Sequence, residues 1–215
     1  KNAEKVALLV SSHTENLTTV LALVESTAAR GPGGAQGPDL LDWRRDTFEA
    51  ALLAPRSPFT QVALLDRSGR EVAHVSRFHT YLPGELVSRA GDPGIAEASA
   101  GRTWISPVRI SPDSGLLSMQ IAIPFRSPDF QGVLVADANV SRLWMEVSRL
   151  RIGQSGYAYL VDAEGRFLAY QRASEVLQRH GEDMSVMPPV SEFVRERGPA
   201  SEPRVHAYQG LSGQE

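Results

Sequence analysis

The first thirty residues carry apolar side chains at the three- and four-residue spacing of an amphipathic helix. This apolar face comprises Val6, Leu9, Val10, His13, Leu17, Val20, Leu21 and Val24. The pattern predicts one long helix over residues 2–30. Residues 31–38 are rich in glycine and proline and predict a loop, after which Asp39 is expected to be the N-cap of a second helix.

From residue 59 onward the pattern changes to short apolar runs bounded by turn residues, which is typical of strands. Strands are expected at residues 59–65, 70–76, 103–110, 116–125 and 132–139. Asp66 and Gly69 frame a tight turn between the first two. Short helical segments are expected near residues 95–100 and 140–150. This order predicts an α+β fold, in which a long helix packs on an antiparallel five-stranded sheet.

The first hairpin recurs at a constant offset of 96 residues. The matching pairs are Asp66/Asp162, Gly69/Gly165, Arg70/Arg166 and Ala73/Ala169. Four identities on matching apolar runs predict an internal duplication, and accidental similarity of two hairpins is the alternative. A further strand is expected at residues 204–208. The second copy is expected to be incomplete, because it carries fewer strands than the first.

Composition narrows the function. The chain is 42% hydrophobic and 22% charged, with a net charge of −3, which argues against nucleic acid as a partner. It has no cysteine, which excludes disulfides and thiolate sites. Nucleophile-elbow, P-loop and zinc-protease motifs are absent, so this segment is not expected to be an enzyme or to hold a cofactor. No metal is expected either, because no metal-ligand spacing links the histidines, which are His13, His74, His79, His180 and His206.

No apolar run reaches the roughly 20 residues of a membrane span, and both ends are expected to continue into a longer protein. Four segments resemble the double Cache family, the tandem PAS-like extracytoplasmic sensor domains of bacterial transmembrane receptors. Residues 153–162 (GQSGYAYLVD) are similar to the entry into the family's membrane-proximal module. Residues 100–107 (AGRTWISP), 123–125 (IPF) and 132–137 (GVLVAD) are similar to the closing strands of its membrane-distal module.

The resemblance implies three parts. A stalk helix and loop would occupy residues 1–38, a membrane-distal PAS-like module residues 39–150, and an incomplete membrane-proximal module residues 151–215. It also implies a periplasmic or extracellular location in a histidine kinase, diguanylate cyclase or chemoreceptor, and a homodimer formed along the N-terminal helix. A small molecule would bind the membrane-distal module.

Asp137 is the first candidate for that ligand site. It ends an apolar strand, where a carboxylate is costly unless it finds a partner or a wet cavity. In the resembling family the matching Asp lines the pocket and often meets a ligand amine. The alternative is helix capping, because Asp137 and Asn139 both precede a predicted helix.

Other candidates lie on neighbouring segments. Trp104 and Ser106 share one face of a strand and would line the pocket, with core packing as the alternative for Trp104. Ser118 and Gln120 give the next strand a polar face, turned either to the pocket or to solvent. Three more candidates lie in the crossover that covers the pocket of PAS-like modules, namely Arg77, His79 and Tyr81. Arg77 would hold an anion, unless it is simply a surface arginine.

The amino-acid-sensing branch of the family carries an Arg-x-Trp-Tyr run that holds a carboxylate. Residues 90–98 (AGDPGIAEA) lack these residue types, so a ligand of that amino-acid class is not expected. The expected function is ligand sensing with transmission through helix packing. The alternatives are a structural dimerisation module that binds nothing and a free periplasmic solute-binding protein.

Overall fold

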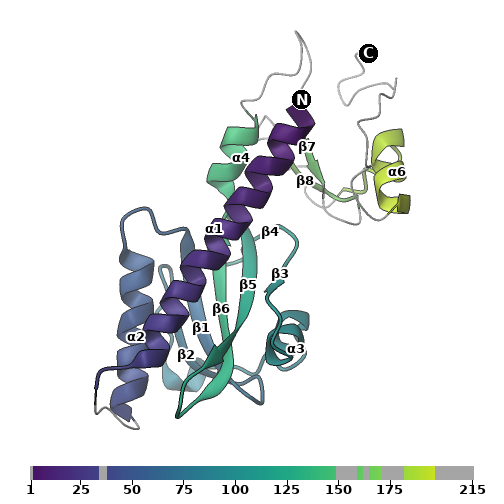
Figure 1. Ribbon diagram of the computed structural model, residues 1–215. Helices are drawn as coiled ribbons and strands as arrows, with labels where there is room; N and C mark the ends of the chain where they lie inside the picture. Colours follow the sequence, from purple (N-terminus) through teal and green to yellow (C-terminus); the bar gives the residue numbers. More distant parts are fainter. Residues whose placement is uncertain (1, 34–37, 149–158, 162–164, 171–181, 197–215) are drawn as a thin grey trace. The chain divides into compact units, whose positions relative to one another are not determined.

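The computed structural model describes residues 2–33, 38–148, 159–161, 165–170 and 182–196 (Figure 1). The chain divides into two compact units, one of residues 11–141 and one of residues 1–10 together with 142–215. We call them the first and the second unit. The predicted assignment of modules to positions near to and far from a membrane stays a prediction.

The fold is α+β with a long N-terminal helix, as the sequence predicted. Helix α1 (Asn2–Arg30) spans the boundary between the units. The remaining elements of the first unit are α2 (Pro38–Leu53), β1 (Phe59–Asp66), β2 (Glu71–Ser76), the 3-10 helix η1 (Pro83–Glu85), α3 (Pro93–Ser99), β3 (Trp104–Ile105), β4 (Arg109–Ile110), β5 (Leu117–Arg126) and β6 (Gln131–Asn139). Asp39 lies inside α2 rather than before it, so its prediction as the N-cap was wrong.

The strands form one antiparallel sheet in the order β2-β1-β6-β5-β3, with β4 paired to the other end of β5. Side chains alternate between its two faces. One face is apolar throughout, with Val62, Ile121 and Leu134 fully buried. Figure 1 shows α1 and α2 beside this sheet, and their buried side chains recur every three or four residues: Leu17, Leu21, Val24 and Ala28 in α1, and Leu40, Arg44, Phe48 and Leu52 in α2.

The opposite face is half apolar and half polar. Its apolar half packs against α3 and Trp104 through a cluster of Ala63, Leu65, Ile95, Ala98, Ala122, Val133 and Val135. Gly94 permits this contact, because a Cβ atom there would lie 2.4 Å from the Trp104 ring. The polar half forms the candidate site.

The single strand expected over residues 103–110 was wrong. Ser106 still donates its backbone N–H to the Gln120 carbonyl, but Pro107 has no N–H to continue the ladder. The chain leaves the sheet there and returns as β4. This break separates β3 from β4, and it places Arg109 opposite Ser118.

The second unit repeats the local structure of the first. Its described elements are α4, which begins at the boundary (Ser141–Ser148), the hairpin β7 (Tyr159–Val161) and β8 (Phe167–Tyr170), and α6 (Pro188–Glu196). Gly69 and Gly165 both have φ of 79°. After each hairpin the returning chain makes an isolated antiparallel bridge, Arg70 to Ser88 in one copy and Arg166 to Asp183 in the other. The repeated Asp162 and the strand expected at 204–208 lie outside the described residues.

The repeat extends further than the sequence indicated. Arg89 donates its N–H to the Gly69 carbonyl, and Met184 donates to the Gly165 carbonyl in the same way. A helix that starts with proline follows in both copies, α3 in the first and α6 in the second. The offset there is 95 residues rather than 96, because the second loop is one residue shorter. None of the helices within the described residues is long and apolar enough to cross a membrane.

Candidate ligand-binding site

A row of polar side chains crosses the sheet at one level. Gln120 on β5 lies opposite Asp137 on β6, and Asp137 lies opposite Gln61 on β1. Since directly paired residues in antiparallel strands point to the same face, register alone brings these three side chains together. His74 on β2 lies one pair further along this face, opposite Ala63.

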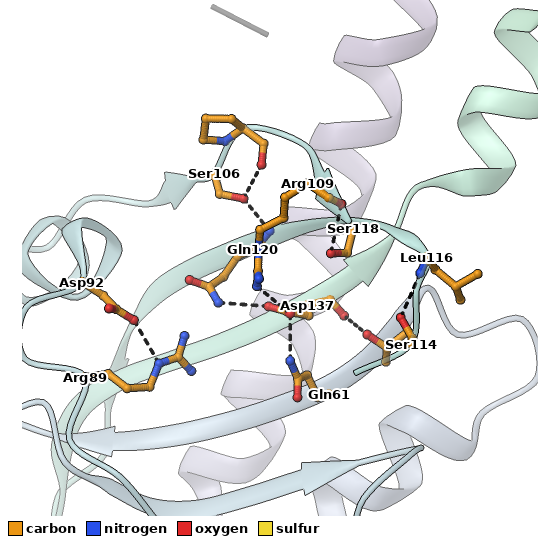
Figure 2. A network of polar contacts seen from close by, with 12 residues as sticks. Gln61, Arg89, Asp92, Ser106, Arg109, Ser114, Leu116, Ser118, Gln120 and Asp137 are labelled. Atoms are coloured by element: carbon orange, nitrogen blue, oxygen red, sulfur yellow. Dashed lines mark hydrogen bonds and ion pairs between the residues drawn. The ribbon is translucent and has the colours of Figure 1, made fainter. Parts of the chain in front are cut away.

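Asp137 is 1% exposed and accepts hydrogen bonds from three directions (Figure 2). Gln120 Nε2 donates to Oδ1 over 3.0 Å. Gln61 Nε2 and Arg109 Nη2 donate to Oδ2 over 2.8 and 2.9 Å. Two donors are neutral amides on neighbouring strands, and the third is a guanidinium on the short strand β4. The buried carboxylate is thus paired with one cation, the Arg109 guanidinium, and with two neutral amides.

The alternative role of Asp137 as a helix cap is not what its side chain does. Both carboxylate oxygens bond within the sheet, and its backbone carbonyl accepts from the Thr60 hydroxyl. Asn139 bonds to the start of the helix instead, since its Oδ1 accepts the N–H of Ser141, the first residue of α4, over 2.9 Å.

The row continues from Asp137 to a buried histidine. Because a carboxylate only accepts, the Gln61 amide must turn its NH₂ to Asp137 and its Oε1 to His74, 3.2 Å from Nε2. The other ring nitrogen, Nδ1, faces the Glu71 carboxylate at 3.3 Å. Both ring nitrogens therefore face oxygen atoms of neighbouring side chains.

Glu71 is 3% exposed and follows His74 in the row. Burial alone would raise its pKa, but the hydrogen bond and charge of His74, the Val87 N–H and the Arg89 guanidinium outweigh burial, so the pKa lies below its ordinary value. Arg89 Nη1 lies 3.5 Å from Glu71, and its Nε donates to Asp92 over 3.0 Å. Buried charge is thus paired along the whole row.

Tyr81 covers the row from the crossover segment. Its ring stacks on His74 with a centroid distance of 3.8 Å, and His79 contacts its edge. Burial raises the pKa of Tyr81, and the charges of Asp113, Glu71 and Asp137 add to the rise while Arg89 opposes it. The charges at both ends of the row, on Asp137 and Arg89, therefore affect the pKa of the Tyr81 hydroxyl.

The sequence candidates separate into three groups. Gln120, Asp137 and Tyr81 belong to the row or touch it. Ser106 and Ser118 support it: Ser106 Oγ accepts the Gln120 N–H over 2.8 Å, and the Ser118 hydroxyl lies 3.5 Å from the Arg109 carbonyl. Three do not join it. Trp104 packs in the apolar half of the face, His79 pairs with Glu85 at 3.7 Å, and Arg77 donates to the Leu52 carbonyl at the end of α2.

Five residues of the row were not recognised in the sequence: Gln61, Glu71, His74, Arg89 and Arg109. The second copy of the hairpin shows that the charges of Glu71 and Arg89 are not needed for this local architecture. Backbone contacts match Glu71 with Phe167, Arg89 with Met184 and Asp92 with Met187. In the second copy these positions form an apolar cluster, with Phe167, Met184 and Met187 between 0% and 7% exposed. The same local architecture thus carries charges in one copy and a simple core in the other.

Two hollows lie at the other end of β6. They measure about 500 and 550 Å³, and Arg67 and Gln131 line both. Neither includes a residue of the row. Within the described residues, no group of three histidine, aspartate or glutamate side chains is arranged to hold a metal ion.

Known structures share this architecture. The ligand-binding domain of the Campylobacter jejuni chemoreceptor Tlp3, in complex with 4-methylisoleucine, superposes with a TM-score of 0.65 at 13% identity, over 81% of this chain and 69% of that one. The chain has the fold of a Cache-type chemoreceptor sensor domain. The Cache-type domain of the Pseudomonas aeruginosa amino acid chemoreceptor PctC, in complex with GABA, matches 95% of this chain and 85% of that one, with a TM-score of 0.61 and 19% identity.

A third Cache-type structure, that of P. aeruginosa PctB with L-Arg, has a TM-score of 0.60 and 23% identity, and covers 86% of this chain and 73% of that one. In sequence, the methyl-accepting chemotaxis protein PscA of Pseudomonas syringae pv. tomato is 28% identical over 133 residues, 61% of this chain. The match spans 21% of that protein. No protein-family model matches the chain.

These comparisons contradict the exclusion of amino-acid ligands. Structures of the same fold hold an amino acid or GABA, at identities too low to carry the ligand over by themselves. The exclusion rested on residues 90–98, and Arg89 lies directly before that segment, with its guanidinium turned to the row. This part of the chain therefore has a cation close to the row, although residues 90–98 contain no Arg.

Proposed function

We propose that the first unit is the ligand-binding part of an extracytoplasmic sensor domain, and that it binds a small amino compound. The ligand ammonium bonds to Asp137, and an anionic end, where the ligand has one, meets Arg89. The observation that carries this proposal is the row from the buried Asp137 to the half-buried Arg89. It places charged side chains on one face of the sheet, while the opposite face is apolar.

The free-energy cost of burying charged side chains supports a functional role for the row. A buried charge destabilises a domain unless it is paired, and well-packed apolar residues usually serve stability better. In the second copy of the hairpin, apolar side chains pack at the matching positions, namely Phe167, Met184 and Met187. Retention of Glu71 and Arg89 in the first copy therefore favours recognition over folding.

Tyr81 is the side chain that responds to the ligand. It covers the row from the segment between β2 and η1 and stacks on His74. A ligand that bonds to Asp137 and Arg89 changes the charges around this phenol, and so biases the covering segment between an open and a closed position. In this proposal the chain is part of a larger receptor that forms a homodimer, and helix α1 passes the bias toward the membrane. The 215-residue chain itself catalyses no reaction.

Isothermal titration calorimetry of the full chain with L-valine, L-arginine and GABA tests the proposal. Asp137→Asn keeps the size of the side chain but removes its charge, and we expect it to weaken binding by at least about thirtyfold, as for other buried charge pairs. Asp129→Asn is the matched control. Asp129 also pairs with an arginine, Arg44, but it lies in the turn between β5 and β6, away from the row. Equal affinity of wild type and Asp137→Asn would refute the proposed site.

A further inference from the structure

The three donors to Asp137 differ in how firmly they are held. Gln61 and Gln120 lie on long strands in the middle of the sheet, and their backbones pair directly with Asp137. Arg109 lies on β4, which has two residues and pairs only with β5 among the described strands. Its side chain is 40% exposed, whereas that of Asp137 is 2% exposed. Arg109 is thus the one donor that can leave without disturbing the sheet.

We propose that Arg109 is an internal competitor for the ligand ammonium. Its Nη2 donates to Asp137 Oδ2 over 2.9 Å, and this is the oxygen to which the proposed ligand ammonium would donate. A ligand must displace this guanidinium into water, which its exposure permits. This inference rests on the proposed binding of an amino compound to Asp137.

The competitor has two consequences. First, it keeps the buried Asp137 carboxylate paired, because an unpaired buried charge would destabilise the domain. Second, it sets a threshold, because a ligand gains only the difference between its own bond to Asp137 and the bond that Arg109 gives up. Arg109 is therefore a specificity-determining residue, which rejects cations that bond to Asp137 no better than a tethered guanidinium does.

Arg109→Gln tests the competitor directly. Glutamine is shorter and uncharged but can still donate to the carboxylate, so the fold is expected to survive, and a thermal unfolding curve confirms this. Arg102→Gln is the matched control, because Arg102 is an exposed arginine paired with Glu97 outside the row. Calorimetry with L-valine, L-arginine and GABA is carried out on wild type, both variants and Asp137→Asn.

We expect Arg109→Gln to raise the affinity for the best of these probes by at least about tenfold, the strength of one charge-assisted hydrogen bond, and Arg102→Gln to leave it unchanged. Weaker or unchanged binding in Arg109→Gln, with binding still lost in Asp137→Asn, would overturn the competitor and leave the proposed site intact. An equal gain in Arg102→Gln would also overturn it. Absence of binding in both wild type and Arg109→Gln would overturn the competitor and the proposed function together.

Discussion

Replacement of Asp137 by alanine and by asparagine should have very different effects on stability. Alanine removes the acceptor for three donors at once. Arg109 can turn to water, because it is 40% exposed. Gln61 and Gln120 are anchored on central strands and would keep their amides facing an empty space.

The magnitude follows from those two amides. A buried donor that loses its acceptor costs about 1–3 kcal/mol, so the loss for two amides in Asp137→Ala is expected to lower the free energy of unfolding by about 2–6 kcal/mol. Asparagine instead offers its Oδ1 to Gln61 and Arg109, and Gln120 can reverse its amide to accept from the new NH₂. Only the charge assistance of the bonds is lost, and it is partly offset because no charge is buried, so we expect about 1 kcal/mol.

Urea unfolding followed by tryptophan fluorescence measures both values under the same conditions. An unchanged slope against urea concentration would show that the variants unfold from a comparable native state. Equal destabilisation by the two substitutions would refute the reasoning, because it would mean that the charge, rather than the acceptor geometry, organises the three donors.

Two further predictions follow from the same structure. Because the pKa of Glu71 is lower in the folded chain than its ordinary value of 4.5, its stabilisation is complete above that value and disappears as the pH falls through the folded pKa. Glu71→Gln should therefore flatten the acid side of the stability–pH profile, and an unaltered slope would argue against this role. Gly94→Ala should cost about 1–3 kcal/mol in thermal unfolding because its Cβ meets the Trp104 ring, whereas Gly91→Ala, where nothing lies within 4 Å, should be close to neutral.

The sequence predicted those features that are visible in a short stretch of residues. Asp137 stood out because a carboxylate ended an apolar strand, and Gln120 because it interrupted an apolar alternation. The long helix α1 followed from periodicity alone. These features depend on neighbours a few residues away, which the sequence displays directly.

The rest of the row depends on register between distant strands. Gln61 meets Asp137 only because β1 pairs with β6 at that residue. Arg109 reaches Asp137 because Pro107 breaks the predicted strand and the chain returns as β4 on the other end of β5. The match between α3 and α6 was hidden by a one-residue difference in the loops, which shifted the offset of the repeat.

The most direct test of the account is a ¹H–¹⁵N NMR titration of the full chain with L-valine, L-arginine and GABA, in which the side-chain amide signals of Gln61 and Gln120 are assigned. The account predicts that at least one of these compounds shifts both pairs of signals in a saturable way, because the amides share the Asp137 carboxylate with the incoming ammonium. Saturable binding that leaves both amides unmoved and shifts the signals around Arg67 and Gln131 instead would place the ligand in the hollows at the other end of β6, and would contradict the central claim.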